Sequence, residues 1–284
     1  EISACLVGSE MCIRDRDFMK YFAPILFLAI SLSGCDTGPD LAKICNESPE
    51  LCNDFHEDSW CKRERANMIV ARNRLKLADK DVNKYRLLLG YEDYAKCMSH
   101  ASKIEHIKLK NKKRSRVDNV VKAKQKIKEM SDETKNSMHP ELLFYHWSRY
   151  LNEAALENFL KLEGMPALEN PESQFNLATY YIKRDPDKTL SLLFRSLELL
   201  KADQTVNKEV FKSLTTIFTD QNEYKQAYIW LKVLNLYDPE DTSISEKTLE
   251  KYSLGYDLDA KFLNQVAAAT LEKIEAGTFE APKH

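Results

Sequence analysis

Apolar residues recur at intervals of three and four through most of the chain, and this spacing predicts an all-α protein. Two such stripes lie close together, one starting at Cys61 and the other at Leu87. Their members are Cys61, Glu64, Met68, Ala71, Leu75 and Ala78 in the first, and Leu87, Gly90, Tyr94, Cys97, Ala101 and Ile104 in the second. Each set shares one face of a helix. The segment Asp79-Lys80-Asp81 separates them as a turn with an aspartate N-cap, so we expect a helical hairpin.

A repeating pattern follows in the C-terminal half. In a 34-residue unit that starts at Lys208, large and small apolar residues alternate between two predicted helices, and a proline ends the pair. These residues are Phe211, Leu214, Phe218, Ala227, Leu231 and Pro239. The unit resembles a tetratricopeptide repeat, with Thr215 in place of its glycine and Leu234 in place of a small residue, so helix packing is expected to be looser. The resemblance implies an α-solenoid of tetratricopeptide-like helix pairs.

A second unit precedes this one by about 37 residues. It contains Leu177, Ala178, Tyr181, Leu190, Phe194 and Leu197. Residues 140–164 and 245–274 are predicted to form further helix pairs that cap the array, because a solenoid otherwise exposes its apolar ends. Tyr180 and Tyr228 lie outside the predicted core positions, so they are candidates for contact with a bound protein.

The N-terminal region has the pattern of an export signal. Met19-Lys20 precedes a short apolar run, residues 21–32, which is typical of a secretory signal peptide. The run ends in Leu32-Ser33-Gly34-Cys35, which resembles the bacterial lipobox. The resemblance implies that Cys35 is acylated, for example by palmitate, and anchors the protein to membrane lipid. Asp36 favours the inner membrane, although the outer membrane stays open, as do a non-lipidated signal and a short buried helix.

These patterns divide the chain into six segments. Residues 1–18 contain Val7–Arg16, which resembles a translated sequencing adapter, and they are left out of the fold prediction. The signal peptide, residues 19–34, is followed by a tether and small cysteine loop, residues 35–56. A disulfide-linked helical region with a basic segment spans 57–138, the repeat region 139–276 and a tail 277–284.

Four cysteines remain after the lipobox: Cys45, Cys52, Cys61 and Cys97. An exported domain with an even number of cysteines is expected to form disulfides, and four cysteines allow three pairings. Cys61 and Cys97 each lie 18 residues from Asp79, so they face each other across an antiparallel hairpin. We therefore favour Cys61–Cys97 with Cys45–Cys52. The alternative is a metal site that uses Cys45, Cys52, Cys61 and His56.

Charge adds little to this picture. The net charge is −2, which gives no support for a nucleic-acid partner. The exception is residues 108–128, which are rich in lysine and arginine and are interpreted as a solvated linker and helix face. Contact with anionic lipid headgroups is the alternative interpretation.

Motifs for catalysis are missing from the sequence. With 7 glycines, the chain has no phosphate-binding loop, and it has no GxSxG, HExxH or EF-hand motif. Histidines such as His100, His106, His139 and His146 lie in predicted helices or their lead-ins and are interpreted as structural. We therefore expect no enzyme activity and no cofactor.

The lipobox, Pro49-Glu50-Leu51-Cys52, Asp58-Ser59-Trp60-Cys61 and the repeats together resemble an uncharacterised Gram-negative lipoprotein family over residues 19–277. The resemblance implies a location in the cell envelope and a helical fold but no activity. The first hypothesis is thus a membrane-anchored scaffold that faces the periplasm and binds an envelope protein or peptide. The alternative is an envelope enzyme or metal-binding protein with a site near His56 and the cysteines.

Overall fold

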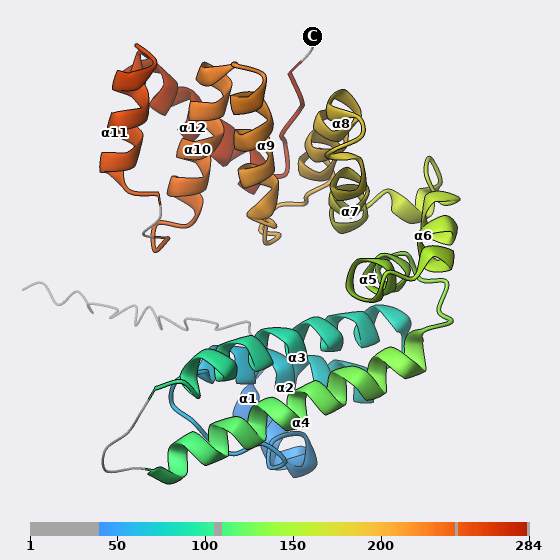
Figure 1. Cartoon of the computed structure of the whole chain (residues 1–284). Helices are drawn as coiled ribbons and strands as arrows, with labels where there is room; N and C mark the ends of the chain where they lie inside the picture. The colour runs from blue at the N-terminus through green and yellow to red at the C-terminus, as the bar shows by residue number, and fades with distance from the viewer. Residues whose placement is uncertain (1–39, 105–109, 242–243, 283–284) are drawn as a thin grey trace, which may run out of the picture. The chain divides into compact units, whose positions relative to one another are not determined.

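Helices form all of the regular secondary structure in the residues that the computed structural model describes, 40–104, 110–241 and 244–282 (Figure 1). These ranges contain twelve α-helices, two short 3-10 helices and no β-strand. The predicted all-α fold class is therefore confirmed. The described residues belong to one compact unit, Pro39–His284. The predicted signal peptide and Cys35 lie outside the described residues.

The helices are short in most of the chain and longest in α3 and α4. The first part contains α1 (Leu41–Glu47), η1 (Pro49–Leu51), α2 (Lys62–Leu77), α3 (Asp81–Ala101) and α4 (Lys110–Thr134). Next come α5 (Pro140–Tyr150), α6 (Glu153–Leu160), η2 (Pro166–Leu168), α7 (Pro171–Tyr181) and α8 (Pro186–Glu198). The last are α9 (Glu209–Asp220), α10 (Tyr224–Tyr237), α11 (Glu246–Gly255) and α12 (Ala260–Glu275). Within the described ranges, no helix has both the length and the apolar character to cross a bilayer.

Helices α2 and α3 form the hairpin that the two apolar stripes predict. Met68 and Tyr94 are almost fully buried in one core cluster, in which each stripe contributes the face toward the other helix. Gly90 of α3 faces α2, since a Cβ atom added there would lie 3.4 Å from the Cα atom of Met68, an ordinary van der Waals contact. The stripe residues in or packed against this core cluster are Cys61, Met68, Ala71 and Leu75 from the first stripe and Leu87, Tyr94, Cys97 and Ala101 from the second.

The turn between α2 and α3 differs from the prediction. The residue before α3 is Lys80, whose side chain makes no capping hydrogen bond. Asp79 instead pairs with Lys84, with 3.2 Å between Oδ1 and Nζ. The side chain of Asn83 donates from Nδ2 to the carbonyl of Ala78 at 2.8 Å. The predicted aspartate N-cap is wrong, because the helix starts at Asp81 and places Lys80 at the N-cap position, while the carboxylate of Asp79 pairs with Lys84.

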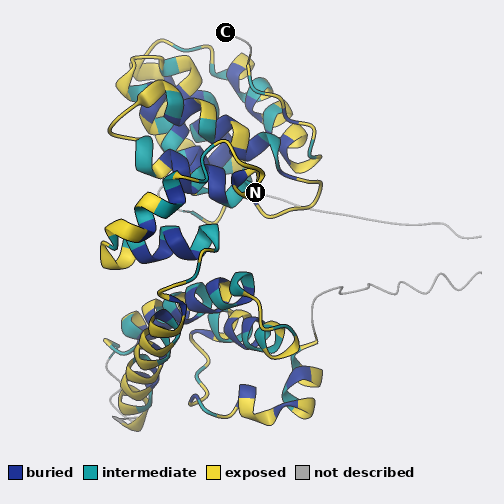
Figure 2. Ribbon diagram, turned by 90° about the vertical axis from the view of Figure 1, so that its right-hand side faces the viewer, coloured by how far each residue is buried: buried dark blue, intermediate teal, exposed yellow. Residues whose placement is uncertain are grey.

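Residues 108–128 are predicted to form a solvated linker and a helix face, but residues 110–128 all lie in helix α4. The chain is helical from Lys110 onward, and α4 packs along α3. Ala123 and the polar side chains of Arg116 and Asn119 are buried on its inner face. Figure 2 shows exposed residues along the opposite side of this long helix. The prediction of a solvated helix face is therefore correct for residues 110–128, and the prediction of a linker is wrong there.

The middle helices connect the hairpin to the repeat region. Leu142 and Tyr145 of α5 pack with Tyr85 and Leu88 of α3 in one small buried cluster. The other side of α5 contributes Leu143 to a second cluster, which includes residues of α6, η2 and α7. Helix α5 is thus held between α3 and α7.

The two predicted repeat units correspond to the helix pairs α7–α8 and α9–α10, and within each pair the helices pack against each other. Phe211, Leu214 and Ala227 are fully buried, as their repeat positions require. Leu234, which replaces a small residue, is also buried at 1% exposure. The interface thus accommodates the larger side chain within the core.

The C-terminal helices do not form the predicted capping pair. Helix α12 packs mainly on α10, and its residues Ala267, Leu271 and Ile274 complete the core of the repeat region. The chain after α12 also contributes to this core, because Phe279 is buried against Phe194 and Trp230. The array is therefore closed by α12 and the segment that follows it.

Candidate functional site

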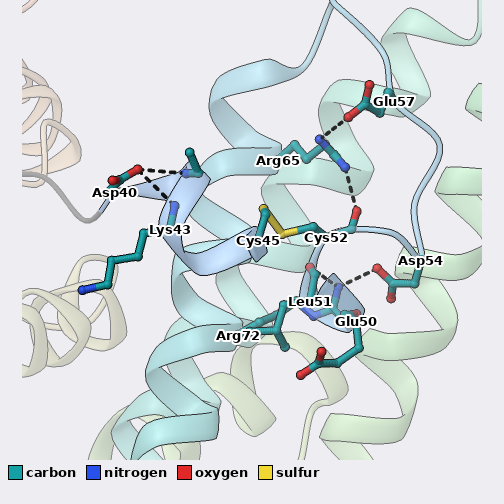
Figure 3. Close-up of a disulfide and its surroundings, with 11 residues drawn as sticks. Asp40, Lys43, Cys45, Glu50, Leu51, Cys52, Asp54, Glu57, Arg65 and Arg72 are labelled. Atoms are coloured by element: carbon teal, nitrogen blue, oxygen red, sulfur yellow. Dashed lines mark hydrogen bonds and ion pairs between the residues drawn. A yellow bond between two sulfur atoms is a disulfide. The ribbon is translucent and has the colours of Figure 1, made fainter. Parts of the chain in front are cut away.

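Two disulfides hold the N-terminal helices, and they are the pairs favoured by the hairpin geometry. The structure contains Cys45–Cys52 and Cys61–Cys97, with Cα–Cα distances of 5.7 and 6.0 Å. The first bond ties α1 to the residue after η1 (Figure 3). In the chain-entropy model, a loop of the length closed by the second bond stabilises the fold by about 3 to 4 kcal/mol.

Arginines of α2 fix the small cysteine loop in place (Figure 3). Arg72 donates from Nη1 to the carbonyl of Leu51 at 2.8 Å and to Oδ1 of Asp54 at 2.6 Å. Arg65 donates to the carbonyl of Cys52 at 2.7 Å. These bonds satisfy carbonyl groups that the irregular backbone leaves without partners, so the loop is part of the hairpin's rigid base.

The alternative metal site loses its thiolate ligands in this arrangement. All four of its neighbouring cysteines are disulfide-bonded, and a bonded sulfur does not supply the thiolate that a zinc site requires. The backbone of His56 is held by Asn119, with hydrogen bonds of 2.9 and 2.8 Å. In the described residues, the one cluster with metal-ligand spacing is Cys61, Glu64 and Cys97, which includes a disulfide.

A buried ion pair joins the loop before α2 to helix α4. Arg116 Nε lies 2.7 Å from Oδ2 of Asp58, and the two side chains are 2% and 5% exposed. Burial raises the pKa of Asp58, but hydrogen bonds from Arg116 and from the Trp60 N–H outweigh it, so the pKa lies below its ordinary value. Asp58 is therefore a charged partner that fixes α4 on the hairpin.

The best candidate for a binding site is a cleft formed by α3, α5, α7 and the start of α9, with a volume of about 580 Å³. We call it the α5–α7 cleft. Its apolar lining includes Leu89 of α3, Phe144 and Trp147 of α5, Phe175 of α7 and Ile182, the residue after α7. Its polar residues include Arg149, Glu172, Asn176 and Thr179. An apolar cavity with a few convergent polar groups is the usual form of a ligand site.

Asn176 is the most informative residue of the α5–α7 cleft. It lines the cleft, it is only 4% exposed, and its Nδ2 atom has no hydrogen-bond partner among the described residues. A buried amide without a partner costs about 1 to 3 kcal/mol. Asn176 is therefore a residue of the cleft whose amide donor the fold leaves unsatisfied.

Glu172 lies one helical turn before Asn176 on α7 and accepts a hydrogen bond from the hydroxyl of Tyr85 at 3.0 Å. Burial raises the pKa of Glu172, and Glu141 raises it further, while the bond from Tyr85 acts in the opposite direction. Burial also raises the pKa of Tyr85, with Glu172 as the second cause. The pair therefore joins α3 to α7 with the hydroxyl as donor.

The positive charge in the cleft is already neutralised by a carboxylate. Arg149 donates to both oxygens of Glu92, from Nε at 3.1 Å and from Nη2 at 3.2 Å. Tyr145 donates to the same carboxylate at 2.9 Å. Glu92 thus orients both side chains, and the wall of the cleft toward α3 is rigid.

The two tyrosines predicted to contact a partner have different positions. Tyr228 is 2% exposed and donates to Oδ1 of Asn264 at 3.0 Å, so its prediction as a contact residue is wrong. It is needed for packing α10 against α12. Tyr180 is half-buried, and its ring lies 5.7 Å from that of Trp147, a cleft residue. Tyr180 therefore remains beside the candidate site.

Comparison with known proteins gives one family. The family model described as "Protein of unknown function (DUF2989)" matches residues 32–232. This range includes both disulfides and every residue that lines the α5–α7 cleft. No curated protein and no solved structure gives a significant match.

Proposed function

The chain belongs to this family of proteins of unknown function, DUF2989, and we propose that it is a membrane-anchored envelope lipoprotein whose helical domain binds a partner protein. The observation that carries the binding role is the unpaired, buried amide of Asn176 in the apolar α5–α7 cleft. The tetratricopeptide-like helix pairs form the scaffold that positions one wall of this cleft. Its role is to bind a partner and not to catalyse a reaction.

Membrane anchoring is supported by two observations. The tetrad Leu32-Ser33-Gly34-Cys35 follows a short apolar run, and the family match starts at Leu32, the first residue of the tetrad. The two disulfides fit an oxidising compartment, where such bonds form and persist. Acylation of Cys35 would hold the domain on the periplasmic side of the inner membrane, which Asp36 favours, or of the outer membrane.

The chemistry of the α5–α7 cleft suits a peptide segment with an apolar side chain. Phe144, Trp147 and Phe175 supply apolar surface, and Asn176 supplies one donor for a main-chain carbonyl. Aromatic surface next to a buried polar anchor is typical of the residues that dominate protein interfaces. A partner that pairs with Asn176 also removes the free-energy cost of its unpaired amide.

The polar residues of the cleft support binding over catalysis. Arg149 is paired with Glu92, and Glu172 accepts a hydrogen bond from Tyr85. Among the residues that line the cleft, no serine, cysteine or lysine forms a hydrogen-bonded pair with a histidine base. A nucleophile hydrogen-bonded to a histidine base is one common arrangement for nucleophilic catalysis.

Anchoring is tested by labelling cells with radioactive palmitate. The expressed protein should carry the label, and Cys35→Ser should abolish it. Ser31→Ala is the matched control, since it changes a residue of the same apolar run outside the tetrad and should keep the label. Absence of label from the unaltered protein would contradict the lipoprotein assignment.

Partner binding is tested with a photocrosslinking residue in the cell envelope. Placed at Thr179, which is exposed and lines the cleft, it should give a discrete adduct. Placed at Thr216, which is exposed on α9 away from the cleft, it should not. The adduct at Thr179 should disappear when Asn176 is also changed to Leu. An adduct that persists in that variant, or that forms equally from Thr216, would exclude the α5–α7 cleft as the binding site.

A further inference from the structure

Helix α4 presents a row of positive charge along its exposed side. Residues at intervals of three and four share one side of a helix. The row, which we call the basic stripe, consists of Lys113, Arg114, Val117, Val121, Lys124 and Lys128, and all six are exposed. On the opposite side, Arg116 and Asn119 are buried against the hairpin. The stripe is therefore a surface feature and not part of the core.

Acidic residues of α4 lie at one edge of the basic stripe. Asp118, the one acidic residue between positions 113 and 128, lies four residues after Arg114, and Asp132 lies four residues after Lys128. Val117 and Lys124 have no acidic residue three or four positions away on α4. Glu129 pairs with Lys126, which lies outside the stripe. Within the described part of the chain, Arg114, Lys124 and Lys128 form no ion pair. Their charge is available to an anionic partner.

Two exposed valines lie between the cations of the stripe. Val117 and Val121 are 44% and 60% exposed, although a helix that is solvated on this side would carry polar residues at both positions. Apolar residues flanked by lysine and arginine are typical of helices that lie at the boundary between lipid headgroups and acyl chains. A nucleic-acid surface gives no reason for the valines.

The start of α4 lies beside the place where the N-terminal tether enters the domain. Leu41, at the start of α1, and Lys112, in the first turn of α4, line the same shallow pocket. Cys35 precedes Asp40 by five residues, which span at most about 18 Å when extended. If Cys35 is acylated, a step that rests on the proposed function, the first turn of α4 is held close to the bilayer.

We propose that the basic stripe binds anionic phospholipid headgroups, so that α4 lies along the membrane surface. The lysines and Arg114 attract the headgroup phosphates, and Val117 and Val121 contact the outer part of the acyl region. The stripe supplies a second, reversible contact beside the lipid anchor.

The test uses the segment 39–284, which is the compact unit of the structure, in oxidised form and without the anchor. Its cosedimentation is measured with vesicles of phosphatidylcholine alone and with vesicles that also contain phosphatidylglycerol. We expect binding to the mixed vesicles only. The variant Arg114→Glu, Lys124→Glu, Lys128→Glu should bind at least about tenfold more weakly, from the attraction per basic residue near an anionic surface.

A matched variant controls for net charge. Lys247, Lys251 and Lys261 are exposed on α11 and α12, and their change to Glu alters the net charge by the same amount. This variant should bind as the unaltered segment does, and Val117→Ser with Val121→Ser should weaken binding while leaving its salt dependence intact. Equal loss in both triple variants, equal binding to uncharged vesicles, or tighter binding to duplex DNA than to the mixed vesicles would overturn the proposal. Because the segment lacks Cys35, this result is independent of palmitate labelling.

Discussion

The hydroxyl of Tyr85 on α3 donates a hydrogen bond to the carboxylate of Glu172 on α7, although the two residues are 87 positions apart. This bond lies at one wall of the α5–α7 cleft and joins the disulfide-linked hairpin to the first repeat pair. Both side chains are largely withdrawn from water, so the bond is stronger than a similar pair at the surface.

Tyr85→Phe should lower the free energy of unfolding by about 2 kcal/mol at neutral pH, because it leaves a buried carboxylate without its donor. Burial raises the pKa of Glu172 in the folded state. The contribution of Glu172 to the stability of the protein is therefore full at low pH, where the carboxyl is protonated, and is lost as pH rises through the folded pKa. Removing the donor raises this pKa further. The destabilisation by Tyr85→Phe should therefore be larger at pH 7 than near pH 4, in denaturation curves at both pH values.

Tyr94→Phe is the control for this experiment. Tyr94 is also fully buried on α3, but its hydroxyl has no hydrogen-bond partner among the described residues. The change should therefore leave the stability unchanged or increase it, at both pH values. An equal loss from the two substitutions would mean that the bond between Tyr85 and Glu172 contributes nothing specific.

Asn176→Leu should separate stability from binding. The free protein should become more stable by about 1 kcal/mol, because an unpaired buried amide is replaced by an apolar side chain of similar size. Partner crosslinking from Thr179 should be lost in the same variant. Thermal unfolding and crosslinking measured side by side provide the check. A destabilised Asn176→Leu protein would indicate that the amide has a structural partner in the fold.

Arg116→Met should cost about 3 kcal/mol of stability, because it leaves the buried carboxylate of Asp58 without its counterion. The pKa of Asp58 is lowered in the folded state, so the pair stabilises the fold above the ordinary value of 3.8 and the contribution is lost as pH falls through the folded pKa. Acid unfolding of Arg116→Met should show less of this loss. Lys126→Met breaks the exposed pair with Glu129 and should change stability by less than about 1 kcal/mol.

His146 should make the protein less stable in mild acid. The side chain is 4% exposed, and burial lowers its pKa, although a hydrogen bond with Thr134 partly offsets the effect. The unfolded chain therefore binds a proton more readily, and stability falls as pH decreases below the ordinary value of 6.5. In His146→Gln this decline should be smaller in denaturation curves between about pH 7 and pH 5. His100→Gln, on the exposed surface of α3, should keep the full decline.

Gly277→Ala should destabilise the C-terminal closure of the core by about 2 kcal/mol or more. Gly277 has a φ angle of +65°, and an added Cβ atom would lie 2.7 Å from the backbone nitrogen of Ala202. Gly164→Ala has a similar φ angle of +76° but no atom within 4 Å, so it should show the strain without the clash. The difference in melting temperature between the two variants measures the close contact with Ala202.

Much of the fold could be predicted because apolar spacing reports directly on helix faces. The stripes that contain Cys61 and Cys97 gave both the hairpin and the disulfide pairing, since equal distances from the turn place the two residues at one height. Helix ends were harder to predict. Asp79 is a good N-cap residue by type, but α3 starts one residue too late for it: Lys80 holds the N-cap position, and Asp79 pairs with Lys84.

The candidate site could not be predicted in the same way. Tyr85, Glu172 and Asn176 come from helices that are distant in the sequence, and nothing in local spacing brings them together. One signal was present: Asn176 lies between two apolar residues, the half-buried Phe175 and the buried Leu177, and a polar side chain at such a position requires a partner. Tyr228 shows the opposite error, because its aromatic ring fills the contact between α10 and α12.

Among the described residues, both disulfides lie within α1–α3 and the loops that join them. Helices α7–α12 are held together without a covalent crosslink, by apolar packing and by polar contacts such as the Tyr228–Asn264 hydrogen bond and the Lys232–Glu246 ion pair. Reduction of the disulfides should therefore loosen the hairpin, and with it the wall of the cleft that the hairpin supports, while the repeat pairs lose no crosslink.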